Sequence, residues 1–328
     1  MKRRREKIPK IGAKLRENGA EEKACYIAAP CGTINGNLIF GDFMAKRHRK
    51  QKRRLLVAVL LLAAILGALW WGNTSIETEE FTFTSAALPA SFDGYRAAVL
   101  TDLHGASFGE NNETLLAAVK AQSPDVIFLV GDLVDERTED AQDYAAHLGT
   151  ALSGIAPTYF VTGNHEWARG TEETERIKTA LIGSGVTVLS NEFCELSRGD
   201  NTVVLAGIDD PNGYADQKTP EALAAEIYAA YGDPFWVLLA HRNDRFASQY
   251  SLLGADLTIS GHGHGGCIRL PLTDGLLGTQ HNLLPSHTAG FYEDNGAVLF
   301  VSRGLGNVGH TFRVFNRPQV AVITLERG

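Results

Sequence analysis

Carboxylate, amide and imidazole side chains recur along this chain in short motifs, and each motif follows an apolar run. The motifs are Asp-Leu-His at 102–104, Gly-Asp-Leu-Val-Asp at 131–135, Gly-Asn-His-Glu at 163–166, the single His241, and Gly-His-Gly-His at 261–264. Oxygen and nitrogen ligands without thiolate suit Mn, Fe or Zn better than a structural zinc–sulfur site. The motifs offer enough ligands for two metal ions side by side, which favours metal-assisted hydrolysis of a phosphate ester.

Two of these motifs place a pair of ligands on one side of the chain. Alternate residues of an extended segment share a face, so Asp102 and His104 point the same way. His262 and His264 repeat this arrangement. Asp132 follows a glycine that permits a tight turn, and its two carboxylate oxygens are able to bridge two cations. The residue types and their spacing therefore agree with a dinuclear site.

The elements that must position these motifs alternate between short apolar strands and amphipathic helices. The strands are expected at Arg96–Thr101, Val126–Val130, Tyr159–Thr162, Val186–Leu189, Val203–Ile208, Trp236–Ala240, Leu257–Ser260, Val298–Ser302 and Gln319–Leu325. The helices are expected at Glu113–Gln122, Glu139–Leu152, Glu172–Gly183, Pro220–Tyr231 and Asp244–Leu253. This alternation predicts a layered α/β fold with parallel or mixed sheets. Each motif follows a strand, and ligands gather at the carboxyl ends of strands in such folds.

The ordered motif set resembles that of the calcineurin-like metallophosphoesterases, whose pattern is D-x-H, G-D-x-x-D, G-N-H-[DE], H and G-H-x-H. Every motif is present in this order, and the resemblance covers roughly residues 94–328. The segments 207–211, 261–271 and 301–306, with a late Arg-Pro, look like the membrane-anchored bacterial phosphodiesterase branch. The resemblance implies an α/β layered sandwich of two mixed β-sheets flanked by helices.

The resemblance also implies a ligand set and a catalytic pair. One metal would be bound by Asp102, His104 and His264, and the other by Asn164, His241 and His262, with Asp132 as the bridge. His165 would protonate the leaving oxygen, and Glu166 would orient the His165 ring. The two cations would lower the pKa of a shared water, so that hydroxide attacks the phosphorus.

Several residues near the motifs have roles that the sequence leaves open. Asp135 matches a position behind the ligands and is not expected to bind metal. Arg242-Asn243-Asp244 and Cys267 depart from what close relatives show, and Cys267 is expected to be a packed side chain rather than a ligand. Asp209 and Asp210 serve either the site or the fold.

A loop near the C-terminus contains a further group of cationic side chains, Arg303, His310 and Arg313. We expect this group to lie in a solvated loop, with contact to substrate phosphate as the alternative.

Two other functions are alternatives to a phosphodiesterase. Amidohydrolases also use His-x-His and Asp ligands, but their His-x-His comes on the first strand and their Asp near the end, the reverse of this order. A metal-binding scaffold of the same fold without catalysis would lack some ligands, whereas this chain has all seven. The order and completeness of the motifs therefore favour a catalytic phosphodiesterase.

An uncharged apolar run over residues 55–71 predicts a transmembrane helix, with Trp70 and Trp71 suited to one membrane interface. Seven Lys and Arg residues lie between positions 46 and 54, directly before this run. By the positive-inside rule, the N-terminus stays in the cytoplasm and the residues after the run lie outside it. A cleaved export signal is the alternative to a single-pass anchor.

These features divide the chain into four regions. Residues 1–54 are predicted to be a basic, disordered cytoplasmic segment, in which residues 1–43 are a tail or an over-extended start. Residues 55–71 form the anchor, residues 72–90 a linker, and residues 91–328 the metallophosphoesterase domain.

Charge is distributed unevenly along the chain. Residues 1–54 have 16 Lys and Arg against 5 Asp and Glu, and the remainder has 15 against 33. An acidic domain repels polyanions, so nucleic acid is not expected as a partner of its general surface. A small or lipid-linked phosphoester is the expected substrate, because bound metals would set the local charge.

Overall fold

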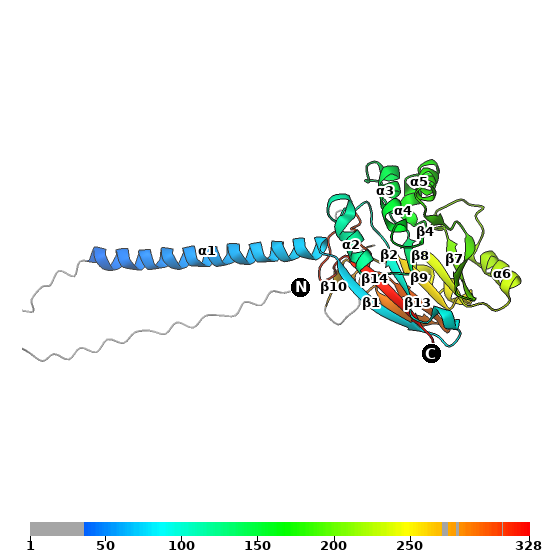
Figure 1. Ribbon diagram of the computed structural model, residues 1–328. Helices are drawn as coiled ribbons and strands as arrows, with labels where there is room; N and C mark the ends of the chain where they lie inside the picture. Colours follow the sequence, from blue (N-terminus) through cyan, green and yellow to red (C-terminus); the bar gives the residue numbers. More distant parts are fainter. Residues whose placement is uncertain (1–35, 271–274, 280–281, 310) are drawn as a thin grey trace, which may run out of the picture. The chain divides into compact units, whose positions relative to one another are not determined.

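The computed structural model of the chain describes residues 36–270, 275–279, 282–309 and 311–328. The chain divides into two compact units, residues 1–59 and residues 60–328. Most of the predicted tail, including Cys25 and Cys31, lies outside the described residues. Helix α1 runs from Gly36 to Thr74 (Figure 1). The prediction of disorder over residues 36–54 is therefore wrong, because Lys, Arg, Gln and Ala in this segment are good helix formers.

Part of helix α1 fits the predicted membrane span. The stretch Lys46–Thr74 is long and apolar enough to cross a membrane by length and composition, and the run 55–71 lies within it. Its apolar side chains are exposed to the surroundings. Among the described residues, α1 is the single candidate for a transmembrane helix.

Two six-stranded sheets form the centre of the unit over residues 60–328 (Figure 1). The first has the strand order β1 (Glu77–Thr84), β14 (Gln319–Glu326), β2 (Tyr95–Leu100), β3 (Val126–Val130), β4 (Thr158–Val161) and β5 (Thr187–Val188). The second has the order β12 (Gly290–Asp294), β13 (Ala297–Val301), β9 (Leu257–Gly261), β8 (Trp236–Arg242), β7 (Asn201–Ile208) and β6 (Glu192–Arg198). A two-stranded sheet joins β10 (Ile268–Arg269) and β11 (Gly275–Leu277).

Both sheets are mixed, as predicted. Strands β2, β3, β4 and β5 are mutually parallel, and β14 is antiparallel to β2. Strands β13, β9, β8 and β7 are also mutually parallel, and β12 and β6 are antiparallel to them at the two edges. The carboxyl ends of the parallel strands within each sheet therefore meet at one edge.

The domain core has four layers, with the two sheets between two layers of helices. Strand β3 is apolar throughout because both of its faces are buried. Its residues Phe128 and Val130 belong to the core between the sheets, which also includes Leu239 of β8. Ile127 and Leu129 face the other way and pack with helices. This alternation is the period of two that a strand imposes on its side chains.

Helices cover the outer face of each sheet. The first sheet packs against α2 (Glu113–Ala121), α3 (Ala141–Ser153) and α5 (Thr171–Gly183). The second packs against α6 (Pro220–Tyr231). A short helix, α4 (Asn164–Ala168), follows β4 directly. The strands and helices that the sequence predicts are present here with small differences at their ends, apart from one helix.

That exception is the helix predicted over Asp244–Leu253. The structure instead has two single 3₁₀ turns, Asn243–Arg245 and Tyr250–Leu252. Gln249 has φ −139° and ψ −61°, which interrupts a helix between these turns. The apolar residues that suggested a helix, Phe246 and Tyr250, are buried against the second sheet all the same.

The prediction of a linker over residues 72–90 is also wrong. Residues 77–84 of this segment form strand β1, which pairs in parallel with β14 along its whole length. Phe81 and Phe83 alternate along it and pack on the core between the sheets. The strand is locally rich in Thr and Glu, which is why its composition resembles a linker.

Candidate metal centre

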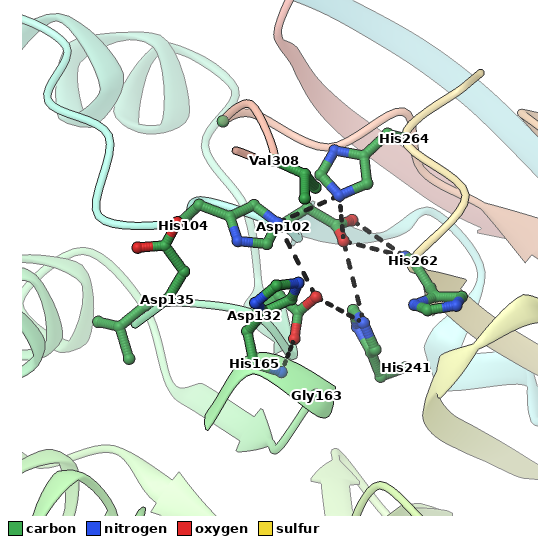
Figure 2. A network of polar contacts seen from close by, with 12 residues as sticks. Asp102, His104, Asp132, Asp135, Gly163, His165, His241, His262, His264 and Val308 are labelled. Atoms are coloured by element: carbon green, nitrogen blue, oxygen red, sulfur yellow. Dashed lines mark hydrogen bonds and ion pairs between the residues drawn. The ribbon is translucent and has the colours of Figure 1, made fainter. Parts of the chain in front are cut away.

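The predicted ligands lie at or next to the carboxyl ends of central strands, and Figure 2 labels all of them except Asn164. Asp102 and His104 follow β2, and Asp132 follows β3. Asn164 begins helix α4 immediately after β4. His241 lies in β8, and His262 and His264 follow β9. The two parallel sets of strands thus supply the site from both sheets.

The ligand atoms form two groups that share one residue. Asp102, His104, Asp132 and His264 offer atoms that lie within 4.8 Å of one another. Asp132, His241 and His262 form a second group by the same measure. Asp132 is therefore the side chain common to both groups, which is the position that a bridging carboxylate would need.

Ring nitrogens and carboxylate oxygens converge at short distances. His104 Nε2 and His264 Nε2 are 3.1 Å apart, and His264 Nε2 is 3.2 Å from Asp102 Oδ1. His241 Nε2 is 3.0 Å from Asp132 Oδ2, while His241 Nδ1 lies 2.9 Å from the Val130 carbonyl oxygen. With Nδ1 as the donor to that carbonyl, a neutral His241 ring would leave its Nε2 lone pair facing the site.

Three polar atoms at the second group fit a metal ion. Asn164 Oδ1 and His262 Nε2 are buried and have no hydrogen-bond partner among the described residues, whereas His241 Nε2 lies 3.0 Å from Asp132 Oδ2. Buried polar atoms are normally hydrogen-bonded, so each unpaired one requires an explanation. An oxygen and two imidazole nitrogens are suitable donors for Mn, Fe or Zn, and the residues present therefore fit such an ion.

Five of the candidate ligand residues have a left-handed backbone. Their φ angles are positive at Asp102 (51°), His104 (49°), Asp132 (52°), His262 (65°) and His264 (48°). This region is uncommon for residues with a Cβ atom and concentrates at functional sites. The repetition at five ligand positions indicates that the fold holds these side chains in place against local preference.

Glycine at position 131 permits the His241 ring to lie close to the backbone that follows β3. Gly131 has φ +78°, and a Cβ atom there would lie 2.5 Å from His241 Nδ1. Only glycine adopts this conformation at little cost and leaves room for the imidazole.

Comparison with known proteins identifies the family. The calcineurin-like phosphoesterase family matches residues 95–266, which are 172 of the 328 residues. The match begins at β2 and ends just after His264, so it contains all seven predicted ligands.

The chain belongs to the calcineurin-like phosphoesterase family.

Two sequence relatives agree with this assignment, and one solved structure is reported beside them. An uncharacterized metallophosphoesterase of Bacillus subtilis, YkuE, is 27% identical over 295 residues, covering 85% of this chain and 99% of that protein. A transmembrane protein with a metallophosphoesterase domain from Danio rerio is 28% identical over 250 residues, covering 73% of this chain and 55% of that protein. A solved dimetal phosphatase from Danio rerio has a TM-score of 0.41 and 14% identity, covering 67% of this chain and 91% of that chain.

Membership in this family excludes the amidohydrolase alternative.

The pKa values of three histidines in this calcineurin-like site suit the binding of cations. Burial lowers the pKa of His104 to about 4 and that of His262 to about 3, and it lowers the pKa of His264 well below its usual value. Metal binding requires neutral imidazole, which these rings therefore offer at neutral pH. Burial disfavours the charged form of Asp132, but His241 outweighs burial and holds the pKa of Asp132 below its usual range.

In this calcineurin-like site, the structure gives the Glu166 carboxylate other hydrogen-bond partners than the His165 ring that it was predicted to orient. Its buried carboxylate accepts backbone N–H groups from Gly163 (2.7 Å), Asp132 (2.9 Å) and Val134 (3.1 Å). It makes no hydrogen bond with the His165 ring that the structure describes. Burial and the neighbouring Asp132 raise the pKa of Glu166 to about 7. Glu166 therefore connects the loops that carry Asp132 and Gly163 through their backbone N–H groups.

Glu136 is the residue that contacts His165. Its Oε2 atom is 3.0 Å from His165 Nδ1. Burial alone would lower the pKa of His165, but Asp132 and Glu136 outweigh it and raise that pKa above its usual value. Glu136 was not among the residues predicted for the site, although its position directly after the Gly-Asp-Leu-Val-Asp motif indicates that it lies near the ligands.

The remaining residues near this calcineurin-like site make structural contacts. Asp135 accepts hydrogen bonds from Arg137 and does not join either ligand group. Asp209 pairs with Lys178 at 2.9 Å, and Asp210 pairs with Arg242 at 2.7 Å.

Cys267 is buried and free, and it belongs to neither ligand group.

Arg303 and Arg313 do not lie in a solvated loop. Arg303 pairs with Glu77 and Glu79 of β1 at 2.8 and 3.0 Å. Arg313 is buried, and its guanidinium donates to the carbonyl groups of Gly306 and Arg303 and lies 3.4 Å from His264 Nδ1. His310 lies outside the described residues. Arg313 therefore lies behind a candidate ligand rather than in solvent.

Proposed function

We propose that this member of the family is a dinuclear-metal phosphodiesterase whose catalytic domain lies outside the cytoplasm. The observation that carries the proposal is the pair of ligand groups that share Asp132. Asp102, His104 and His264 would bind one ion, and Asn164, His241 and His262 the other. Two divalent ions, Mn, Fe or Zn, would supply a water of lowered pKa and neutralise the charge of the substrate phosphate.

His165 is the proposed general acid. Its ring contacts the His104 ring edge to face, with centroids 4.7 Å apart, and its backbone N–H donates to Asp132 Oδ1 at 2.8 Å. Because Nδ1 is engaged by Glu136, Nε2 is the ring atom left to donate a proton to the leaving oxygen. Glu136 orients the ring and favours its charged form. The resemblance of segments 207–211 and 301–306 to the phosphodiesterase branch supports a diester over a monoester.

Metal content and hydrolysis test this proposal together. The full chain in detergent is analysed for bound Mn, Fe and Zn, and its rates are measured on bis(p-nitrophenyl) phosphate and p-nitrophenyl phosphate. We expect Asp132→Asn to reduce the diester rate by a factor of about 100 or more, because the bridging charge is lost. Asp216→Asn, at an exposed position, is the matched control. Equal diester rates in wild type and Asp132→Asn would leave a metal-binding scaffold without catalysis as the better description.

The location of the domain is part of the same proposal. The seven cations before the candidate span support a cytoplasmic N-terminus. Protease added to spheroplasts should degrade the catalytic domain and leave the cytoplasmic segment attached to α1. A domain that resists protease until the membrane is disrupted contradicts this topology, and a mature chain that begins after residue 71 indicates a cleaved signal.

A further inference from the structure

The hairpin β10–β11 is the centre of a small hydrogen-bonded assembly beside the metal centre. Ile268 pairs with Leu277 across the hairpin and also bridges to Val314. Leu277 bridges in turn to Leu283 on its other side. We define the hairpin assembly as residues 267–270, 275–277, 282–284 and 311–315.

The hairpin assembly exposes an unusual number of large apolar side chains. The exposed fractions are 46% for Leu270, 74% for Leu283, 75% for Leu284, 55% for Phe312 and 72% for Phe315. In the described part of the domain after residue 75, the only other exposed Leu, Ile or Phe side chains are Ile182 and Leu252. A concentration of exposed apolar side chains marks an interaction surface.

The C-terminal end of helix α1 binds to the same assembly. The Asn73 side chain donates to the Arg313 carbonyl oxygen at 3.0 Å and accepts from the Arg313 backbone N–H at 2.7 Å. The Arg317 guanidinium lies 4.4 Å from the centre of the Trp71 ring and donates to Ser75 Oγ at 2.8 Å. Two hydrogen bonds at Asn73 thus connect the hairpin assembly to the last turn of the candidate membrane span.

Tryptophan marks where a bilayer surface would meet this end of the helix. Trp70 and Trp71 are 70% and 53% exposed, and such amphipathic rings favour the level of the lipid headgroups. The exposed residues Phe312 and Phe315 lie one and two positions from Arg313, to which Asn73 is bonded. The apolar side chains therefore lie next to the part of α1 that would enter lipid.

The hairpin assembly is also connected to the metal centre. A pocket of about 200 Å³ is lined by the candidate ligand His262 and by Gly278, Asn282 and Ser286, the last two of which flank Leu283 and Leu284 in the sequence. On the other side, the Arg313 guanidinium lies 3.4 Å from Nδ1 of His264. The segment that carries two of the exposed leucines, Leu283 and Leu284, thus also contributes to the wall of the pocket.

We propose that the exposed apolar side chains of the hairpin assembly enter the membrane surface from which α1 emerges, and that they bring a membrane lipid phosphoester to the pocket beside His262. The substrate part of this inference rests on the proposed function. Transfer of exposed Leu and Phe side chains from water into the lipid interface is favourable, and α1 holds them at that interface. The lipid chains would remain in the bilayer while the phosphoester enters the pocket.

A fluorescent label tests membrane entry without any need for activity. The full chain is reconstituted in vesicles of phosphatidylcholine and phosphatidylglycerol, with Phe315→Cys carrying an NBD group and with Cys25, Cys31 and Cys194 replaced by Ser. We expect blue-shifted emission that nitroxide-labelled lipid chains quench. The same label at Leu252→Cys, an exposed position on another element, should remain in water. Emission from Phe315→Cys that is typical of water overturns the proposal, as does shielding without lipid quenching, which indicates a second protein copy as the occupant.

Two phosphodiesters with the same chromogenic group test the substrate class. Hexadecyl p-nitrophenyl phosphate is presented in the vesicles, and bis(p-nitrophenyl) phosphate is presented in solution. The variant Leu283→Ser/Leu284→Ser/Phe312→Ser/Phe315→Ser should lose roughly tenfold or more of its rate on the hexadecyl ester and keep its rate on the soluble ester.

The matched control, Ile182→Ser/Leu252→Ser, should keep both rates. Equal loss on both esters, or no loss on either, overturns the lipid assignment. If wild type hydrolyses neither ester, the proposed function fails, whereas the label still reports on membrane entry.

Discussion

The carboxylate of Glu166 accepts a hydrogen bond from the backbone N–H of Asp132, with 2.9 Å between oxygen and nitrogen. This contact connects the loop after β4 to the residue that both ligand groups share. Together with the bond from Gly163, it fixes the relative position of two ligand loops that are about thirty residues apart in the sequence.

Replacement of this carboxylate should weaken both the fold and the metal centre. In Glu166→Gln the amide has one acceptor oxygen for three backbone donors, and its NH₂ group faces a donor. We expect the free energy of unfolding to fall by about 2 kcal/mol, since buried donors lose their partners. Thermal unfolding in detergent measures this change, with Glu139→Gln at an exposed position as the control. An unchanged melting temperature and metal content would contradict the role.

His165 and Glu136 should contribute unequally to the rate. We expect His165→Ala to reduce kcat on a poor leaving group such as an alkyl phosphodiester by about 100-fold or more, because the proton donor is lost. Glu136→Gln keeps a hydrogen-bond partner for Nδ1 but loses the charge, so a loss of about tenfold is expected. The ratio of rates for alkyl and nitrophenyl leaving groups is the measurement. A Glu136→Gln loss that is as large as that of His165→Ala would show that Glu136 does more than orient the ring.

Asn164 should determine how much metal the second group holds. Its Oδ1 atom is buried without a partner, and removal of this oxygen leaves His241, His262 and the shared Asp132. We expect Asn164→Ala to reduce bound metal from about two ions per chain to about one. Elemental analysis after dialysis measures the ratio, and Asn212→Ala provides an exposed control. Two ions retained in Asn164→Ala would remove this residue from the ligand set.

Gly94 and Gly131 have similar φ angles, so alanine variants at the two positions distinguish the cost of backbone strain from the cost of crowding. Gly94 has φ +76° and no atom within 4 Å of an added Cβ, whereas Gly131 has φ +78° and its Cβ would approach His241. Gly94→Ala should cost about 1 kcal/mol from the backbone alone. Gly131→Ala should cost about 3 kcal/mol or more and lower metal affinity, because His241 must move. Equal melting temperatures for the two variants would contradict the crowding at Gly131.

The sequence by itself determined the type of most elements and the residues that meet at the site. Strands such as Val126–Val130 are apolar on both faces, and helices such as Pro220–Tyr231 begin with a recognisable capping residue. These signals are local, because periodicity and capping depend on neighbouring residues. The ordered ligand motifs were equally clear, since each follows a strand and the carboxyl ends of parallel strands meet.

Only the tertiary structure decided which distant groups pair. From the sequence, the segment with Glu79 and Phe81 was predicted to be a linker. In the structure it is strand β1, which pairs with β14 more than two hundred residues away. Glu166 is next to His165 in the sequence, yet its carboxylate accepts a hydrogen bond from the backbone N–H of Asp132. The contact of Asn73 with Arg313 likewise joins the two ends of the unit over residues 60–328. Such contacts depend on the three-dimensional arrangement of many segments, and a local pattern contains no information on which partner is nearest.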